Sequence, residues 1–237
     1  MISLQDTLKL NNQAVELYHS DDFAQAAKAY YKSLCSMNKI LKGCYDHADV
    51  MVLAANSTSA PQQECLHCTS FNTTTTHHHH HQHQEEPFLY QRPIVLQESA
   101  GASESLCTMQ AMTIYCSGVL LNTAILHHQE AILTGSSASV DRAAKLYEAS
   151  LHLVGKFHVY SGSNKTVSLI VMAASNNLAQ IELQKGILDQ ACKRLQVLKS
   201  LIRSLQNVIP HIFTREEFGG MLSNSLSAES VIASPAA

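Results

Sequence analysis

Thiol and imidazole side chains that could bind a metal are concentrated in residues 65–83. Cys65, His67 and Cys68 stand close together, and a run of histidines follows at 77–81 with another at 83. Thiolate and imidazole ligands at short spacing suit Zn²⁺, but structural zinc sites usually combine two spaced ligand pairs on a folded knuckle. The second group here is a homopolymer, so we expect low-complexity sequence, no physiological metal site and no cofactor. A zinc-binding or metal-buffering protein that uses Cys65, His67 and Cys68 is the alternative function.

Candidates for catalysis are fewer still. His127 and His128 are adjacent in a predicted helix, and the nearest acid, Glu130, is expected on another face. The sequence contains no G-x-S-x-G nucleophile turn, no glycine-rich phosphate loop and no H-E-x-x-H metal motif. We therefore predict a protein that is not an enzyme.

Composition narrows the function classes. The 237 residues carry a net charge of −3, and only 15% of them are charged. A protein that binds nucleic acid without sequence preference needs a basic patch, so nucleic acid is not an expected partner. No secretory signal is recognised, and Asn176 and Asn177 interrupt the most apolar stretch before it could span a bilayer. We expect an intracellular protein, cytoplasmic or nuclear, without a membrane partner.

Helical periodicity dominates the chain on both sides of a long insertion. The pattern predicts a first helix pair in 1–43, an insertion at 44–104, two further helix pairs in 105–209, and a capping helix with a tail in 210–237. Ser20 or Asp21 is expected to cap the second helix and Gly43 to end it. Ser139 is expected to cap a later helix, and Thr214 with Glu217 forms a capping-box pattern.

The insertion is poor in residues that could form a core. Residues 50–87 are rich in Ser, Thr, Gln and His, so we expect them to be disordered. The stretch that follows, FLYQRPIVLQ, is more apolar. Pro93 argues against a regular strand there. We expect this stretch to pack as an extended segment against the helices.

The last long helix carries a continuous apolar seam. It is predicted over 188–209 and ends before Pro210. Its seam positions follow a strict three-four spacing that demands partner helices along its length. They are Leu188, Ala191, Leu195, Leu198, Ile202, Leu205 and Ile209.

A sequence pattern recurs three times. FAQAAKAYYKSL (23–34) matches VDRAAKLYEASL (140–151) closely, and LDQACKRLQVL (188–198) is a looser copy. Each copy follows a helix that contains Asn-x-Ala, beginning at Asn12, Asn122 and Asn177. In the first and third copies the Ala of this element stands twelve positions before the Ala of the second helix. Small residues on both helices would let the two cross closely.

This spacing resembles the tetratricopeptide repeat, in which a small residue, an alanine twelve positions later and an aromatic four positions beyond mark a helix–turn–helix unit. The resemblance implies an all-α fold of antiparallel helix pairs stacked as a short solenoid, closed by a C-terminal capping helix. The residues expected at its packing positions are Ala14, Ala26, Tyr30, Ala124, Ala143, Tyr147, Ala179, Ala191 and Leu195.

The same resemblance implies a non-catalytic interaction module or adaptor that binds a peptide or helix of a protein partner in its concave groove. The residues expected to line that groove are Asn12, Val15, His19, Asn122, Ile125, His128, Gln129, Asn177, Gln180 and Gln184. For the three asparagines two interpretations stay open: they bond neighbouring backbone between helices, or they bind the backbone of a partner peptide. The basic clamp by which some relatives hold an acidic C-terminal peptide is missing, so that partner class is not predicted.

Overall fold

The computed structural model describes residues 3–44, 87–97, 109–156, 164–205 and 213–233. These residues form helices, three pairs of which are joined by short turns, together with one extended segment at 87–97, and contain no β-strand. The helices are α1 (Leu4–His19), α2 (Phe23–Cys44), α4 (Met109–Thr134), α5 (Ser137–Lys156), α6 (Lys165–Gln184), α7 (Leu188–Ser204) and α8 (Arg215–Ala233). The expectation of an all-helical fold is confirmed for these residues.

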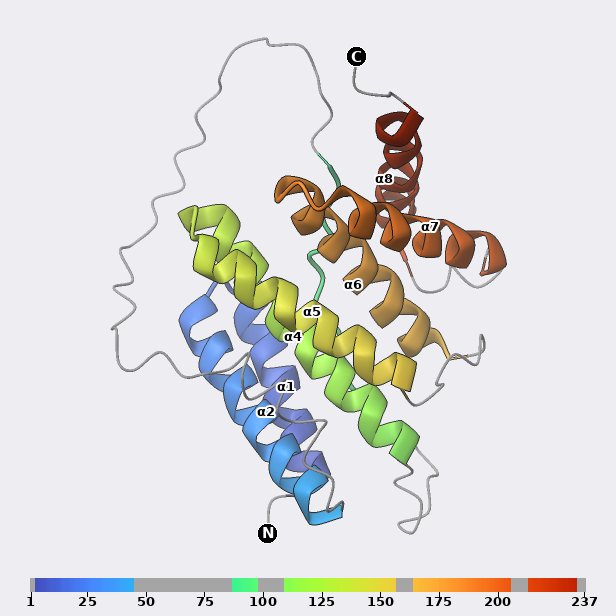
Figure 1. The fold of residues 1–237 in the computed structure, drawn as a ribbon. Coiled ribbons are helices and arrows are strands. Elements are labelled where there is room, and N and C mark those ends of the chain that lie inside the picture. The colour runs from blue at the N-terminus through green and yellow to red at the C-terminus, as the bar shows by residue number, and fades with distance from the viewer. Residues whose placement is uncertain (1–2, 45–86, 98–108, 157–163, 206–212, 234–237) are drawn as a thin grey trace.

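Neighbouring helices pack in chain order (Figure 1). The most extensive contacts join α1 with α2, α4 with α5, and α6 with α7, and further contacts join α2 with α4, α5 with α6, and α7 with α8. Each of the three close pairs is connected by a turn that contains one residue with positive φ. These residues are Asp21 (59°), Gly135 (69°) and Gly186 (72°). The left-handed residue reverses the chain within a few positions, which lets the second helix fold back along the first.

The start of α2 differs from the prediction. Asp22, and not Ser20 or Asp21, caps this helix: its Oδ1 accepts the Gln25 amide at 3.2 Å. Asp21 is the left-handed residue of the turn, so the capping position moves one residue along the chain. Gly43 does not end the helix, which continues to Cys44.

Of the predicted caps at the starts of α5 and α8, the one for α8 is confirmed and the one for α5 is wrong by three residues. The helix α5 begins at Ser137, and its cap is Ser136, whose Oγ accepts the Ser139 amide at 3.3 Å; Ser139 is therefore inside the first turn. The capping box at the start of α8 is confirmed, because the Thr214 amide donates to Glu217 Oε2 and the Glu217 amide donates to Thr214 Oγ1.

The small residues of the repeated pattern are buried in the helix packing. All six alanines and both tyrosines are fully buried, and the leucine at the third aromatic position is 1% exposed. They are Ala14, Ala26, Tyr30, Ala124, Ala143, Tyr147, Ala179, Ala191 and Leu195. Alanine leaves space for the facing helix, and the larger rings fill the volume beside the crossing.

The seam of α7 is shorter than predicted. The helix ends at Ser204, and Ile209 lies outside the described residues. Leu188 begins the helix with 48% of its surface exposed, whereas the five seam positions from Ala191 to Leu205 are buried. The apolar face is thus covered over its middle and C-terminal part.

No helix in the described ranges is both long and apolar enough to cross a membrane.

Candidate functional site: an asparagine ladder

The extended segment 87–97 crosses several helices of the chain. Figure 1 shows it as a narrow green trace that runs from beside α8, past α6 and toward α4. The prediction that FLYQRPIVLQ packs as an extended segment against the helices is confirmed. Its direction is opposite to the order of the helix pairs, since its first residues meet α8 and its last ones meet α1.

Four asparagines bind the main chain of this segment, and we call them the asparagine ladder: Asn12, Asn122, Asn177 and Asn224. At the α8 end, Asn224 Oδ1 accepts the Phe88 amide at 3.1 Å while its Nδ2 donates to the Phe88 carbonyl at 2.7 Å. On α6, Asn177 does the same with Tyr90, at 2.8 and 2.7 Å. Each side chain thus satisfies both polar groups of one residue.

The other two rungs hold the second half of the segment. On α4, Asn122 accepts the Ile94 amide at 2.7 Å and donates to the Ile94 carbonyl at 2.8 Å. On α1, Asn12 accepts the Leu96 amide at 2.9 Å and donates to the Leu96 carbonyl at 2.8 Å. The Tyr115 hydroxyl adds a bond to the Gln97 carbonyl at 3.2 Å.

The geometry of extended backbone explains why every residue that the asparagines bond has an even number. In an extended chain the N–H and C=O of one residue point to the same side, and successive residues alternate. An asparagine amide carries an acceptor and donors side by side, so it pairs with one residue as a neighbouring strand would. The ladder therefore binds the main chain of the segment and does not distinguish its side chains.

Two more asparagines support the ladder. Asn11 donates to Asn12 Oδ1 at 3.1 Å and to the Ile94 carbonyl at 3.3 Å, and it accepts a bond from Asn122 at 3.0 Å. These bonds connect the rungs on α1 and α4 directly.

Asn176 supports the rungs on α6 and α8 in the same way. It donates to Asn177 Oδ1 and to the Phe88 carbonyl, both at 3.1 Å, and it accepts a bond from Asn224 at 2.8 Å. Because Asn176 is fully buried, its amide is fixed in orientation by these bonds. The rungs are therefore held in position by their neighbours as well as by the segment.

Side chains of the segment fill spaces between the helices. Tyr90 is 1% exposed, and its ring meets that of Phe213 edge-to-face with centroids 6.0 Å apart. Burial raises the pKa of the Tyr90 hydroxyl. The Arg92 guanidinium lies 6.0 Å from the centre of the Tyr90 ring. Gln91 and Val95, in contrast, are exposed.

At position 92 the segment is held by an ion pair and not by an asparagine. Its guanidinium donates two hydrogen bonds to the Glu217 carboxylate, at 2.8 and 3.0 Å. The hydrogen bonds to Glu217 raise the pKa of Arg92. Since Glu217 also belongs to the capping box of α8, the segment is tied to the start of that helix.

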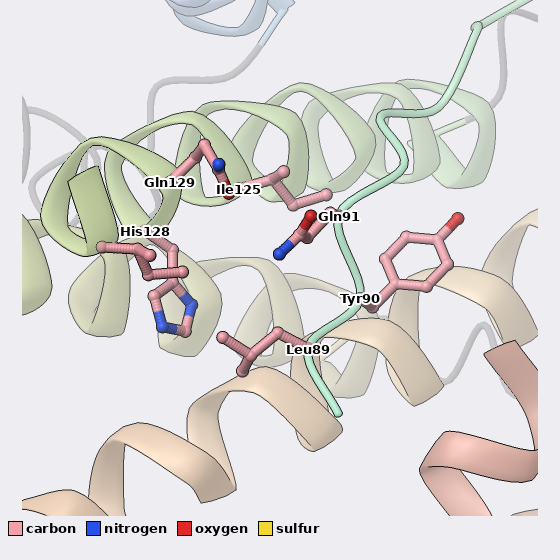
Figure 2. Close-up of a pocket in the computed structure, with 7 residues that line it drawn as sticks. Leu89, Tyr90, Gln91, Ile125, His128 and Gln129 are labelled. Carbon is pink, nitrogen blue, oxygen red and sulfur yellow. The ribbon is translucent and has the colours of Figure 1, made fainter. Parts of the chain in front are cut away.

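A small pocket lies between the segment and α4 (Figure 2). Figure 2 shows Leu89 and Gln91 pointing toward the α4 side chains, whereas Tyr90 points the opposite way. The pocket is lined by Leu89, Tyr90, Gln91, Ile125, His128, Gln129 and Ile132. It is the place where odd-numbered side chains of the segment meet the helices.

His128 is the buried titratable group of this pocket. It is 5% exposed, and burial lowers its pKa to about 4, so the ring is neutral at pH 7. The Tyr147 hydroxyl lies 3.5 Å from its Nδ1 and accepts a hydrogen bond from Asn177 at 2.9 Å. The histidine thus belongs to the polar contacts behind the ladder.

The expectation that Glu130 lies apart from the histidines is wrong for His127. His127 Nδ1 lies 3.1 Å from Glu130 Oε2, because residues three apart share a helix face. The pair sits near the end of α4, where Glu130 also accepts the Ser139 hydroxyl. The pKa of Glu130 is lowered mainly by the hydrogen bond with His127, and also by the hydrogen bond from Ser139. These contacts join α4 to α5.

The structure brings part of the predicted groove set together. Asn12, Asn122 and Asn177 hold the segment, and Ile125, His128 and Gln129 line the adjacent pocket. Val15 and Gln180 are buried, while His19 and Gln184 are exposed. The last four are not among the residues that bond the segment or line that pocket.

The first interpretation of the asparagines, that they bond neighbouring backbone between helices, describes part of what is observed. They bond backbone of the same chain, but that backbone is an extended segment lying across the helices and not a neighbouring helix. Sequence reasoning missed Asn11, Asn176 and Asn224. The first two directly precede a rung in the sequence. Asn224 stands ten positions after Thr214, the residue that caps α8, and Asn12 stands nine positions after Ser3, the residue that caps α1. This similar distance from the helix start is the signal that could have found Asn224.

The metal candidates Cys65, His67 and Cys68 lie outside the described residues. Within the ranges that the structure does describe, no three His, Cys, Asp or Glu side chains are grouped as metal ligands would be.

Comparison with known proteins gave no match to a protein-family model, a curated protein or a solved structure.

Proposed function

We propose that this chain is a non-catalytic protein-interaction module whose groove binds an extended peptide through its main chain. The observation that carries this proposal is the asparagine ladder, which satisfies the N–H and C=O of four even-numbered residues of the segment. Such bonding is the main-chain recognition that strand addition uses, transferred to side chains of helices. In the structure, the resident segment 87–97 occupies this site.

The arrangement of the helices supports the proposal. The four rungs come from α1, α4, α6 and α8, and three of these are the first helix of a close pair. Tetratricopeptide-like repeats present the first helix of each pair on one concave surface, and we interpret the helix pairs in this way, with α8 as the first helix of a further, incomplete unit.

Exposure of the segment supports its exchange for a partner. Val95 is 54% exposed, and Gln91 and Gln97 are exposed as well. One side of the segment is therefore open to solvent over part of its length. A covalently joined occupant competes with an effective concentration on the order of 1 mM, so a partner must be tight, abundant or aided by weakening of the segment.

The test uses the full-length chain and a fluorescent peptide of residues 86–98. In the Leu96→Ala chain the resident segment loses the contacts of a buried side chain, so more grooves are open to the probe. We expect this chain to bind the peptide about tenfold more tightly than the wild type does, measured by fluorescence anisotropy. Adding Asn177→Ala removes the same rung from the probe and from the resident segment, so the apparent affinity should change little while the resident segment still fills most grooves.

Phe88→Ala, at a half-buried position, is the second variant if Leu96→Ala lowers the circular dichroism signal of the helices. Absence of saturable binding to every folded variant would show that the groove accepts only its own covalently joined segment, and the proposal would be wrong.

A further inference from the structure

The groove has places for side chains as well as for backbone, and Gly220 makes the first of them. A Cβ built on Gly220 would lie 2.6 Å from the Cβ of Phe88 and closer still to its ring. Because these atoms are the base of the side chain, rotation of the phenyl group cannot remove the clash. The absence of a side chain at 220 therefore creates the seat in which an aromatic residue lies against α8.

Gly118 makes a second, less demanding close contact at the other end of the segment, because the atoms that it faces are the far end of the Leu96 side chain. A Cβ at this position of α4 would lie 2.8 Å from Leu96 Cδ2. Leu96 is 2% exposed. The contact fits a branched aliphatic side chain of about this length, and a larger residue at 118 would require the end of that side chain to shift.

The middle of the groove accepts an aromatic ring and a cation. Tyr90 is enclosed beside Phe213, and Arg92 reaches from the exposed side of the segment to both oxygens of Glu217. Bidentate pairing of guanidinium with carboxylate has a geometry that lysine does not reproduce. Side chains at 95 and 97 are exposed and leave those positions free to vary, whereas Gln91 lines the pocket against α4.

We propose that the groove selects partner peptides with an aromatic residue, a second aromatic two positions later, an arginine two positions after that, and a leucine-like residue four positions beyond the arginine. This inference rests on the proposed function and specifies the partner of the same site. The resident segment has this pattern at Phe88, Tyr90, Arg92 and Leu96, and it acts as the occupant that such a partner replaces.

A different protein is the expected source of the peptide, and not a second copy of this chain. A segment exchanged between two copies would make the same groove contacts that each chain already makes with its own. The exchange would gain nothing in the groove, whereas association costs translational and rotational freedom. A partner with additional contacts outside the groove can offset that cost.

The test compares two peptides of residues 86–98, the wild-type sequence and its Phe88→Ala version, on the same full-length chain. The ratio of their affinities cancels the competition from the resident segment. In the Leu96→Ala chain the wild-type peptide should bind more tightly than the Phe88→Ala peptide. Adding Gly220→Ala should reduce that preference about tenfold, because the new methyl group excludes the aromatic side chain but not alanine.

Gly219→Ala is the matched control, since a Cβ there meets nothing within 4 Å. It makes the same change in the same helix and should leave the ratio unchanged. If Gly220→Ala fails to fold, Gly118→Ala in the Leu96→Ala chain provides the second pair, read with the wild-type and Leu96→Ala peptides. An Arg92→Ala peptide should bind roughly two- to fivefold more weakly, with the difference fading at high salt.

Three results would overturn the proposal. Equal binding of all peptides to all chains would leave main-chain recognition intact but show that side chains are not selected. No binding of any peptide would contradict the proposed function itself. A wild-type mass of twice the monomer by light scattering at micromolar concentration would identify a second copy as the partner.

Discussion

Asn177 is the residue at which the bound segment meets the helix core. Its amide bonds both polar groups of Tyr90, and its Nδ2 also reaches the Tyr147 hydroxyl on α5. It is fully buried, so water cannot replace these bonds. Loss of such a side chain costs more than the bonds themselves contribute, because the groups left behind stay buried without partners.

Replacing Asn177 by alanine should therefore destabilise the chain strongly. The amide and carbonyl of Tyr90 each lose their partner, at about 1–3 kcal/mol per group, so we expect the free energy of unfolding in urea to fall by roughly 2–6 kcal/mol. Asn38→Ala is the matched control, because Asn38 Oδ1 has no hydrogen-bond partner among the described residues. Equal losses in the two variants would contradict a role for the ladder in stability.

His128 makes stability depend on pH. Its pKa is about 4 in the folded chain, against an ordinary value of 6.5. As pH falls from 6.5 toward 4, the unfolded chain takes up a proton at this site that the folded chain does not bind. Stability is therefore fully present above pH 6.5 and is lost progressively below it.

A shift of this size corresponds to roughly 3 kcal/mol lost between pH 6.5 and 4. Urea denaturation across this range should give a steeper decline for the wild type than for His128→Gln. The exposed His152→Gln variant should keep the wild-type slope. Parallel slopes in all three chains would show that His128 gains its proton readily in the folded state.

At the scale of elements, α7 tests how the last helix pair is packed. Leu198 is fully buried, and its neighbour Val197 is 52% exposed. Leu198→Asp places a carboxylate among apolar side chains, at a cost of several kcal/mol, and should unfold the C-terminal helices. Val197→Asp adds the same charge on the open side of the same helix and should keep the wild-type circular dichroism. A folded Leu198→Asp chain that only loses self-association would identify the α7 seam as an interface.

The elements were largely predictable from sequence, because periodicity and alanine spacing follow from burial of one helix face. The helix ends were less so: Ser20, Asp21 and Asp22 can each cap, and only the turn geometry decides among them. The end of α7 also differed, since the apolar pattern continues past Ser204, where the helix ends.

The ladder was predictable only in part. Repetition of Asn-x-Ala pointed to Asn12, Asn122 and Asn177, but Asn224 has no such alanine after it. Nothing in the local sequence says that the partner of these amides is a segment far away along the chain. That pairing depends on the stacking of four helices, which places their asparagines in one line.

At the scale of the whole molecule, segment 87–97 connects helices from both ends of the chain. It is bonded to α1 and α4 through Leu96 and Ile94, and to α6 and α8 through Tyr90 and Phe88. The Arg92–Glu217 pair adds a contact at the start of α8. The segment in the groove therefore stabilises the position of α8 relative to the other helices. Replacing it by another peptide would alter the contacts that hold α8.

Residue-resolved amide hydrogen exchange of the wild-type chain tests the central claim most directly. The amides of Tyr90 and Ile94 donate to buried asparagines, whereas those of Gln91 and Val95 donate to no group in the part of the chain that the structure describes. We predict an alternating pattern, with slow exchange at Tyr90 and Ile94 and fast exchange at Gln91 and Val95. Uniformly fast exchange across 88–96 would show that the ladder does not hold the segment, and would contradict the account.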